Sequence, residues 1–342
     1  MRLHVTDYHT VLFDMDGVIT SEYNYWIAAA LTVWECMANA PIAWIEEHAS
    51  ELMSRVFCQT RTIRRAKQAG VNTNWDLGYV TLCLSKYARV SHPDWTLDSC
   101  FAYAEDFLKQ SPLRAPALYH EAAVMMNRAL PRMDDYWEHE RDFWQYMKDR
   151  FQHWYLGDKL YTETYHIRPA APGVRGLVYQ EKPVIPLEKI RYVLERLRTA
   201  GIRLGVGTGR PRGEIETPLR EWGLYDYFDP DSLITYTDIE QAQKKLLSYG
   251  LEGSLAKPHP YIFLKGALGR AFDDSKIATG QFDAACTHGV LVVGDAGADI
   301  LAAQAAGFDF LAVLTGISGR AERPYFEQNH ATYILDDISQ MI

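Results

Sequence analysis

The sequence predicts an α/β protein in which a parallel β-sheet is interrupted by a large helical insertion. Short apolar strands alternate with amphipathic helices after residue 183, a pattern typical of a parallel sheet that is covered on both faces. One apolar strand of the same kind lies far upstream, at Val11 to Phe13. Residues 21–183 carry helical spacing and no convincing strand pattern. We therefore expect a first strand, then a helical insertion, then the rest of the sheet.

The first predicted strand ends in two carboxylates and a glycine: Asp14, Asp16 and Gly17. Residues two apart in an extended chain project to the same side, so both carboxylates are expected to enter one small volume at the strand tip. Two carboxylates so close repel each other unless a cation or a shared proton relieves them. Mg²⁺, which is bound by carboxylate and phosphate oxygens, would do this. Taken alone, the pattern also fits an Asp-rich turn that binds nothing.

The insertion is predicted to be one helix after another, because its apolar residues recur at three- and four-residue spacing. Eight of the nine tryptophans fall within it, and we expect most of this aromatic content to form a helical core. The predicted helices cover Ile27 to Ala38, Ile42 to Val56, Trp75 to Tyr87, Leu97 to Leu108, Ala117 to Ala129 and Met133 to Trp154.

After residue 183 the predicted elements alternate. Helices are expected at Leu187 to Thr199, Gly213 to Trp222, Asp238 to Tyr249, Tyr261 to Leu268 and Ile300 to Ala306. Strands are expected at Ile202 to Val206, Ser232 to Thr235, Gly289 to Val293, Phe310 to Leu314 and Tyr333 to Leu335. The polar connection from Asp273 to His288 has no clear pattern, and its structure stays open.

Three later segments add polar groups near the ends of these strands. Thr208 precedes Gly209 in a glycine-flanked turn, which offers a hydroxyl and exposed backbone N–H groups for phosphate oxygens. Lys257, before a proline that starts a helix, can supply a positive charge. Asp295 and Asp299 follow the strand that begins at residue 289, and Asp295 is placed to complete a metal site with the first aspartate pair.

The four motifs, in this order, resemble those of the haloacid dehalogenase superfamily. Its phosphatase members carry D-x-D-G, a Ser or Thr after an apolar strand, a Lys often followed by Pro, and G-D-x-x-x-D. The resemblance covers residues 8–20 and about 184–315. It implies a Rossmann-like core domain formed by residues 1–20 and 184–342, with an enlarged all-α cap domain at residues 21–183. It also implies a Mg²⁺-dependent phosphatase that hydrolyses a small phosphomonoester, such as a sugar phosphate.

The resemblance assigns roles to the motif residues. Asp14 would be the nucleophile that forms an aspartyl-phosphate, and Asp16 would protonate the leaving oxygen and then activate water. Thr208 and Lys257 would hold the transferring phosphoryl group. The Mg²⁺ ligands would be Asp14, the backbone carbonyl of Asp16 and Asp295, with Asp299 in a supporting position.

Three further residues near the motifs are candidates for phosphate or substrate contacts: Gly17, Gly209 and Arg210. Arg210 follows Thr208 closely enough to touch substrate, although the sequence supports this contact no better than its absence. The segments Ile19 to Glu22 and Val184 to Pro186 are expected to be hinges, about which the helical insertion could close as a lid over the strand ends.

The presence of Asp16 also discriminates within the superfamily. An acid two residues after the nucleophile favours phosphate esters, because dehalogenases do not need it and phosphonatases replace it with a small residue. The run D-x-D-G-V-I-T is similar to that of β-phosphoglucomutase, but the His expected just downstream is missing from Tyr23 to Trp26. A phosphatase is therefore the first hypothesis and a sugar-phosphate mutase the alternative. A third hypothesis, from another class, is a catalytically silent binding or scaffold protein.

The composition excludes several other classes of function. A net charge of -9 over 342 residues disfavours nucleic acid as a partner, because such binding relies on clustered Lys and Arg. No apolar run approaches membrane-spanning length, and the first residues do not resemble a signal peptide. The five cysteines are odd in number and lack C-x-x-C spacing. We expect a cytoplasmic monomer or homodimer whose partner is a small phosphorylated metabolite.

Overall fold

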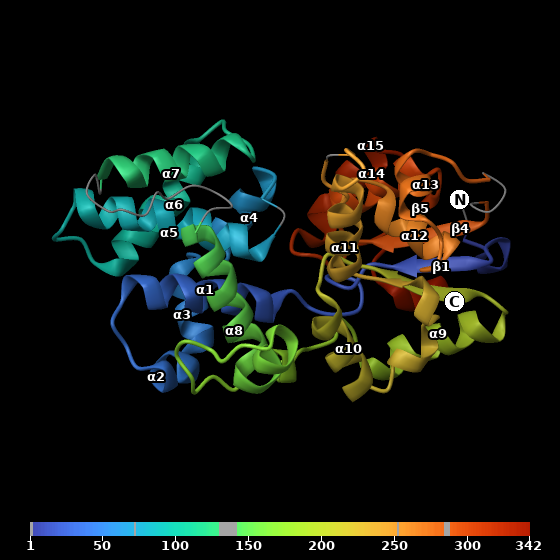
Figure 1. The fold of residues 1–342 in the computed structure, drawn as a ribbon, viewed down its shortest axis with the longest axis horizontal. Helices are drawn as coiled ribbons and strands as arrows, with labels where there is room; N and C mark the ends of the chain where they lie inside the picture. The colour runs from blue at the N-terminus through green and yellow to red at the C-terminus, as the bar shows by residue number, and fades with distance from the viewer. Residues whose placement is uncertain (1–2, 72, 130–141, 252, 284–287) are drawn as a thin grey trace. The chain divides into compact units, whose positions relative to one another are not determined.

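The computed structural model describes residues 3–71, 73–129, 142–251, 253–283 and 288–342 (Figure 1). The chain divides into two compact units. The core unit comprises Met1–Glu22 and Glu181–Ile342, and the cap unit comprises Tyr23–Gln180. The chain thus leaves the core unit early and returns to it once, and each unit is described separately below.

The core unit is built on a parallel sheet of six strands, as the sequence predicts. The strand order is β3-β2-β1-β4-β5-β6, and every neighbouring pair is parallel. The strands are β1 (Thr10–Phe13), β2 (Arg203–Gly207), β3 (Leu233–Ile234), β4 (Val290–Gly294), β5 (Asp309–Val313) and β6 (Tyr333–Leu335). In the central strand β1, Phe13 is level with Val206 of β2 and Val293 of β4. The carboxyl ends of these three strands therefore meet at one edge of the sheet.

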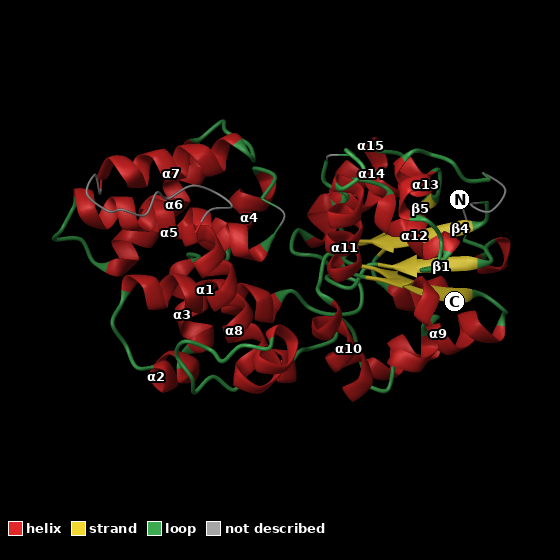
Figure 2. Cartoon of the chain, in the orientation of Figure 1, coloured by secondary structure: helices red, strands yellow, loops and turns green. Residues whose placement is uncertain are grey.

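Helices cover both faces of this sheet (Figure 2). They are α9 (Leu187–Thr199), α10 (Arg212–Glu221), α11 (Tyr236–Leu247), α12 (Tyr261–Leu268), α13 (Asp274–Ala278), α14 (Gly297–Ala306) and α15 (Arg323–Gln328). Val11 and Phe13 of β1 pack with α9 and α10 in one hydrophobic cluster. Leu12, between them, packs in a second cluster with α11, α12, α14 and α15. Strand β1 is therefore buried on both sides, which explains its uninterrupted apolar sequence.

Most core elements lie within a few residues of their predicted bounds, and α9 and α12 coincide with them. Two elements were not predicted. Helix α15 follows β5, and α13 lies in the polar connection whose structure the sequence left open. Residues 284–287 of that connection lie outside the described part of the chain.

The described part of the cap unit contains helices and no β-strand. Its helices are α1 (Tyr23–Met37), α2 (Ile42–Glu47), α3 (Ala49–Val56), α4 (Arg61–Gln68), α5 (Asn74–Ser91), α6 (Leu97–Gln110), α7 (Ala117–Ala129) and α8 (Asp142–Tyr165). The prediction of one helix over Ile42 to Val56 is wrong, because the chain breaks at His48 (φ -99°, ψ 14°). The apolar spacing continues across this break, so periodicity alone could not reveal it.

Helix α8 has a kink at Gly157, whose φ of 75° lies outside the helical region. A Cβ at this position would lie 2.4 Å from the carbonyl oxygen of Arg175, so the close approach of the two backbones also requires glycine. The predicted helix from Met133 to Trp154 lies partly outside the described residues, which resume at Asp142.

A buried charge network joins α8 to α1. Arg150 Nη2 lies 2.8 Å from the Glu35 carboxylate, which also accepts a hydrogen bond from Trp154 Nε1 at 2.9 Å. Arg150 Nη1 lies 2.8 Å from Nδ1 of His153, and Nε2 of His153 lies 2.7 Å from Asp158. Because the guanidinium can only donate, Nδ1 is the acceptor and Nε2 carries the imidazole proton. Burial, followed by the adjacent guanidinium, lowers the pKa of His153, although Asp158 opposes this. This imidazole is therefore neutral at pH 7.

The two predicted hinge segments lie side by side. Thr20 forms an antiparallel bridge with Pro183, and the Ser21 N–H donates to the Lys182 carbonyl at 2.8 Å. The Val184 N–H donates to the Ile19 carbonyl at 3.1 Å. The outgoing and returning chains are thus tied together within the core unit. Among the described helices, none combines the length and the apolar character that a membrane crossing requires.

Candidate active site

The predicted motif residues converge at the carboxyl edge of the core sheet. Asp14 follows β1, and Asp295 and Asp299 follow β4. Their carboxylates form a group whose nearest ligand atoms all lie within 4.8 Å of one another. Lys257, which precedes α12, places its Nζ 2.9 Å from Asp14 Oδ1 and 2.8 Å from Asp299 Oδ1. Three stretches that are remote in the sequence therefore share one small volume.

Asp295 is placed by two glycines. Gly17 has φ +71°, and a Cβ at this position would lie 2.2 Å from Asp295 Oδ2. A Cβ on Gly316 would lie 2.0 Å from the same oxygen. The Thr315 hydroxyl donates to the Gly17 carbonyl and ties the two loops together. The Asp295 carboxylate thus lies in a recess between two glycines, where a side chain on either would clash with it. Glycine is required at position 17 both for this space and for its positive φ.

Asp299 is held from two sides. Its Oδ2 accepts the Ala296 N–H at 3.2 Å at the beginning of α14, while its Oδ1 contacts Lys257. A Cβ on Gly294 would lie 2.6 Å from the Asp299 Cβ, so glycine at the end of β4 gives this side chain its room. Asp299 is 1% exposed. Its carboxylate therefore has little freedom to move, and it fixes Lys257 beside Asp14.

With its three carboxylates ionised, the cluster carries more negative charge than the Lys257 ammonium balances. Three carboxylates and one ammonium then sum to a net charge of -2 (three times -1, plus +1). Burial, together with the nearby Asp299 and Asp16 carboxylates, raises the pKa of Asp14 to about 7, although Lys257 opposes the shift. Burial lowers the pKa of Lys257, but Asp14 and Asp299 outweigh burial and hold it above its usual range. A divalent cation would balance the remaining charge.

The carboxylate of Asp16 is engaged differently from that of Asp14. Its Oδ1 accepts from Arg210 Nε at 3.1 Å and Nη2 at 2.5 Å, and its Oδ2 accepts from Nε at 3.0 Å. Arg210 is 2% exposed, and its Nη1 lies 3.6 Å from Glu181. Arg210 was a candidate for substrate contact, but in the structure its guanidinium faces these two carboxylates. The Asp16 side chain is outside the three-carboxylate group.

Thr208 lies fully buried at the end of β2. Of the backbone N–H groups expected for phosphate at this turn, that of Thr208 is not available, because it donates to the Ile234 carbonyl at 3.1 Å. The Thr208 hydroxyl accepts the Arg210 N–H at 3.2 Å, so this turn is partly closed by its own hydrogen bonds. Gly209 is exposed, and a Cβ there would meet no atom within 4 Å.

Sequence reasoning missed Glu181, Thr315 and Gly316. The last two follow β5, and a polar residue with a glycine at the end of a predicted strand is the signal that could have found them. Glu181 lies in no motif and carries no such signal. Its contact with Arg210 becomes visible only in the folded core.

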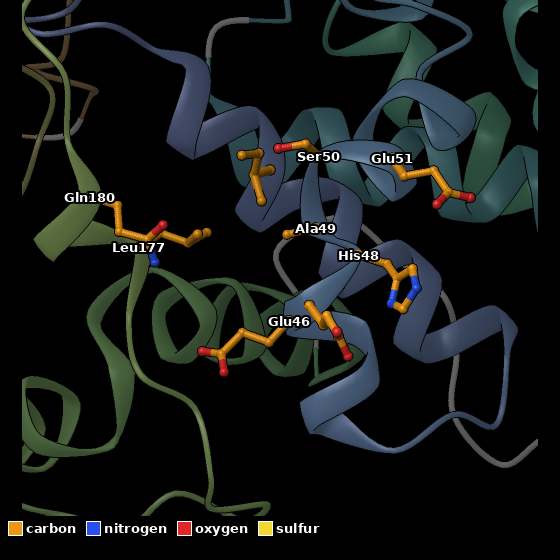
Figure 3. A pocket seen from close by; sticks show the side chains of 9 residues that line it. Glu46, His48, Ala49, Ser50, Glu51, Leu177 and Gln180 are labelled. Carbon is orange, nitrogen blue, oxygen red and sulfur yellow. The ribbon is translucent and has the colours of Figure 1, made fainter.

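A separate pocket of about 310 Å³ lies within the cap unit, lined in part by Leu177 and Gln180. Figure 3 shows that its ionisable side chains Glu46, His48 and Glu51 point in different directions. Glu46 also accepts hydrogen bonds from the Arg175 N–H at 2.7 Å and Nε at 3.0 Å. These groups do not converge on a common point, so the pocket has no arrangement for binding a metal ion.

The chain belongs to the haloacid dehalogenase-like hydrolases, because the model of that family matches residues 8–307. This confirms the resemblance inferred from the motifs, and the protein is a hydrolase. No curated protein matches the sequence.

One solved structure supports the fold, and two others are similar at a lower level. The structure of Northeast Structural Genomics Consortium target ZR25 is 24% identical, with 97% of each chain covered and a TM-score of 0.78. A structure described as a haloacid dehalogenase-like hydrolase from Bacteroides fragilis is 15% identical, with 98% of this chain and 100% of that chain covered and a TM-score of 0.47. One described as a phosphoglycolate phosphatase from Lactobacillus plantarum is 13% identical, with 97% and 96% covered and a TM-score of 0.45. The likeness to the ZR25 structure, at 24% identity, concerns the fold alone.

Proposed function

We propose that this hydrolase is a Mg²⁺-dependent phosphatase that cleaves a small phosphomonoester through an aspartyl-phosphate at Asp14. The observation that carries the proposal is the buried cluster of Asp14, Asp295 and Asp299 with Lys257 at the edge of the sheet. Phosphoryl transfer requires mainly positioned groups and positive charge around the phosphoryl oxygens. The cluster has a carboxylate nucleophile, a fixed ammonium group and a set of oxygen ligands in one place.

The residues present fit Mg²⁺. All three groups are carboxylates, the ligand type that this ion prefers, and their excess charge matches a divalent cation. The recess between Gly17 and Gly316 holds the Asp295 carboxylate where a side chain on either glycine would displace it. Asp14 and Asp295 would hold the ion, with Asp299 in support. When bound, the ion would supply positive charge that offsets the charge of the phosphoryl oxygens.

The reaction would proceed in two steps. An Asp14 carboxylate oxygen attacks phosphorus, the bond from phosphorus to the leaving oxygen breaks, and Asp16 gives that oxygen a proton. Water then attacks the phosphorus of the aspartyl-phosphate and gives its proton to Asp16, which releases inorganic phosphate and restores Asp14. Lys257, 2.9 Å from Asp14, would hold the nucleophile and a phosphoryl oxygen. The Thr208 hydroxyl would contact the phosphoryl group, and Gly17 and Gly209 would let the backbone approach it.

We further propose that residues 21–183 form a cap that excludes water from the aspartyl-phosphate and selects the substrate. The substrate would be a small phosphorylated metabolite in the cytoplasm. The segments Ile19 to Glu22 and Val184 to Pro186, next to the bridge between Thr20 and Pro183, are the expected hinges, because both connections to the cap pass through this region.

Hydrolysis of p-nitrophenyl phosphate tests the proposal. The wild type should release p-nitrophenol only with Mg²⁺, and Asp14→Asn should abolish the release. Asp336→Asn is the matched control, because this exposed carboxylate pairs with Arg320 on the surface and should leave the rate unchanged. Absence of Mg²⁺-dependent turnover on this compound and on a panel of phosphometabolites would overturn the proposal in favour of a silent binding protein. A product that keeps its phosphate at a new position would instead indicate a mutase.

A further inference from the structure

The Asp16 carboxylate is held by one buried guanidinium. Arg210 contacts both carboxylate oxygens through Nε and adds a second hydrogen bond to Oδ1 through Nη2. The Thr20 hydroxyl also approaches Oδ1, at 3.4 Å. Oδ1 is therefore the anchored oxygen, whereas Oδ2 accepts a hydrogen bond from Nε and from no other donor in the described part of the chain. Such a fork fixes the orientation of a carboxylate far better than a single contact does.

Arg210 is in turn braced by Glu181. Nη1 of Arg210 lies 3.6 Å from the Glu181 carboxylate, whose side chain is 1% exposed. The backbone N–H of Arg210 donates to Thr208, so this residue is held at its main chain as well as at its guanidinium. Glu181 is the first residue of the core unit after the cap unit and precedes the Lys182 and Pro183 pairing with the outgoing chain. A chain of contacts thus links Asp16, after β1, through Arg210 to Glu181 in the segment that returns from the cap unit.

We propose that Arg210, braced by Glu181, is a positioning residue that fixes the Asp16 carboxylate for proton transfer to the leaving oxygen through Oδ2. This inference rests on the proposed function, in which Asp16 is the proton donor. Arg210 then acts through Asp16 and does not bind the phosphoryl group. Because Glu181 belongs to the returning connection, the position of that connection bears directly on the orientation of the proton donor.

The proposal predicts a dependence on the leaving group. p-Nitrophenolate leaves without a proton, whereas phenolate, which is more basic, benefits from a positioned acid. In Arg210→Lys, which keeps the charge and loses the fork, kcat/KM for phenyl phosphate should fall by about 100-fold and kcat/KM for p-nitrophenyl phosphate by less than about 5-fold. Glu181→Gln should change the two substrates in the same unequal way, with a smaller loss.

Arg203→Lys is the matched control. Arg203 is a half-buried arginine at the amino end of β2, where its Nε donates to Thr10 at 3.3 Å, on the edge opposite the site. This control should leave the ratio of the two kcat/KM values unchanged. Thermal unfolding of each variant verifies that it is folded, and Glu181→Gln provides the test should Arg210→Lys not fold.

Three results would overturn the inference. Equal losses on both substrates, together with weaker inhibition by inorganic phosphate, would make Arg210 a phosphate ligand. Unchanged kcat/KM for both substrates in folded Arg210→Lys would show that the fork has no role. A wild type that hydrolyses neither compound nor any member of the phosphometabolite panel with Mg²⁺ would remove the proposed function and this inference together, which distinguishes that failure from the other two.

Discussion

The core and cap units each contain a cluster of charged side chains, and the two clusters differ in how closely their carboxylates are crowded together. In the cap, Arg150 pairs with Glu35, and Asp158 accepts hydrogen bonds from neutral His153 and from the Gly173 N–H at 2.7 Å. In the core, Asp14 and Asp299 both contact the Lys257 ammonium group, and Asp295 lies with them in a group of three carboxylates within 4.8 Å. Carboxylates that are separated by the donors of their own network stabilise the fold, whereas carboxylates crowded around one point indicate a site for a cation.

The largest expected effect is on phosphatase turnover, which should depend on the core cluster and not on the cap cluster. Asp14→Asn should reduce phosphatase turnover by more than about 10⁴-fold, because the amide cannot attack phosphorus. Glu35→Gln, which changes a carboxylate of the cap network in the same way, should retain turnover within about fivefold when folded. The measurement is release of p-nitrophenol at saturating Mg²⁺. Similar losses in both variants would contradict the division of the clusters into one for chemistry and one for structure.

The second prediction concerns the charge pair of the cap cluster. Arg150→Met should destabilise the cap unit by about 3 kcal/mol, because it leaves the Glu35 carboxylate without its guanidinium partner. Urea unfolding followed by tryptophan fluorescence measures this, since Trp154 donates to the same carboxylate. The double variant Glu35→Gln with Arg150→Met should recover part of the loss. If the double variant loses at least as much as Arg150→Met alone, the pair is not the cause.

The third prediction concerns the addition of Mg²⁺ to the carboxylates of the core cluster. Mg²⁺ at about 100 times its dissociation constant should stabilise the protein by about 2.7 kcal/mol, because the ion binds the folded site. Asp295→Asn should remove most of this stabilisation, and Asp336→Asn should preserve it. Thermal unfolding with and without Mg²⁺ measures the difference. An equal shift in Asp295→Asn and wild type would place the ion elsewhere.

The smallest expected effect concerns the pH response of the cap network. Because burial lowers the pKa of His153, the folded chain keeps this imidazole neutral while the unfolded chain takes up a proton below about pH 6.5. The unfolded state then binds more protons, so this residue should cost at most about 1 kcal/mol of stability between about pH 6.5 and about pH 5.5. His153→Gln should lose this dependence in urea unfolding. The same slope in variant and wild type would assign it to other groups.

The comparison of the units also explains what the sequence could predict. Strand β4 and helix α9 follow from local patterns, because Val-Leu-Val-Val between glycines and an apolar stripe depend on neighbours in the chain. The motif aspartates could be placed at one sheet edge, because parallel strands end together. The contact between Arg210 and Asp16 could not, because it joins residues 194 positions apart through side-chain orientation.

The cap shows the same limit more strongly. Its helices α1 and α5 were predicted from apolar spacing, but that spacing does not mark the break at His48, and the kink at Gly157 depends on a tertiary contact. The backbone at Gly157 lies close to the Arg175 carbonyl, and the pattern of apolar residues does not indicate this contact. The domain boundaries at residues 20 and 184 and the roles of the individual site residues stay predictions.

Chemical trapping of the covalent intermediate tests the central claim most directly. Enzyme mixed with substrate and Mg²⁺ is quenched in acid, treated with borohydride, which reduces an aspartyl-phosphate to homoserine, and digested for mass spectrometry. The account predicts homoserine at position 14 in the wild type and none in Asp14→Asn. Homoserine at another aspartate, or none in an enzyme that turns over substrate, would contradict the assignment of Asp14 as the nucleophile.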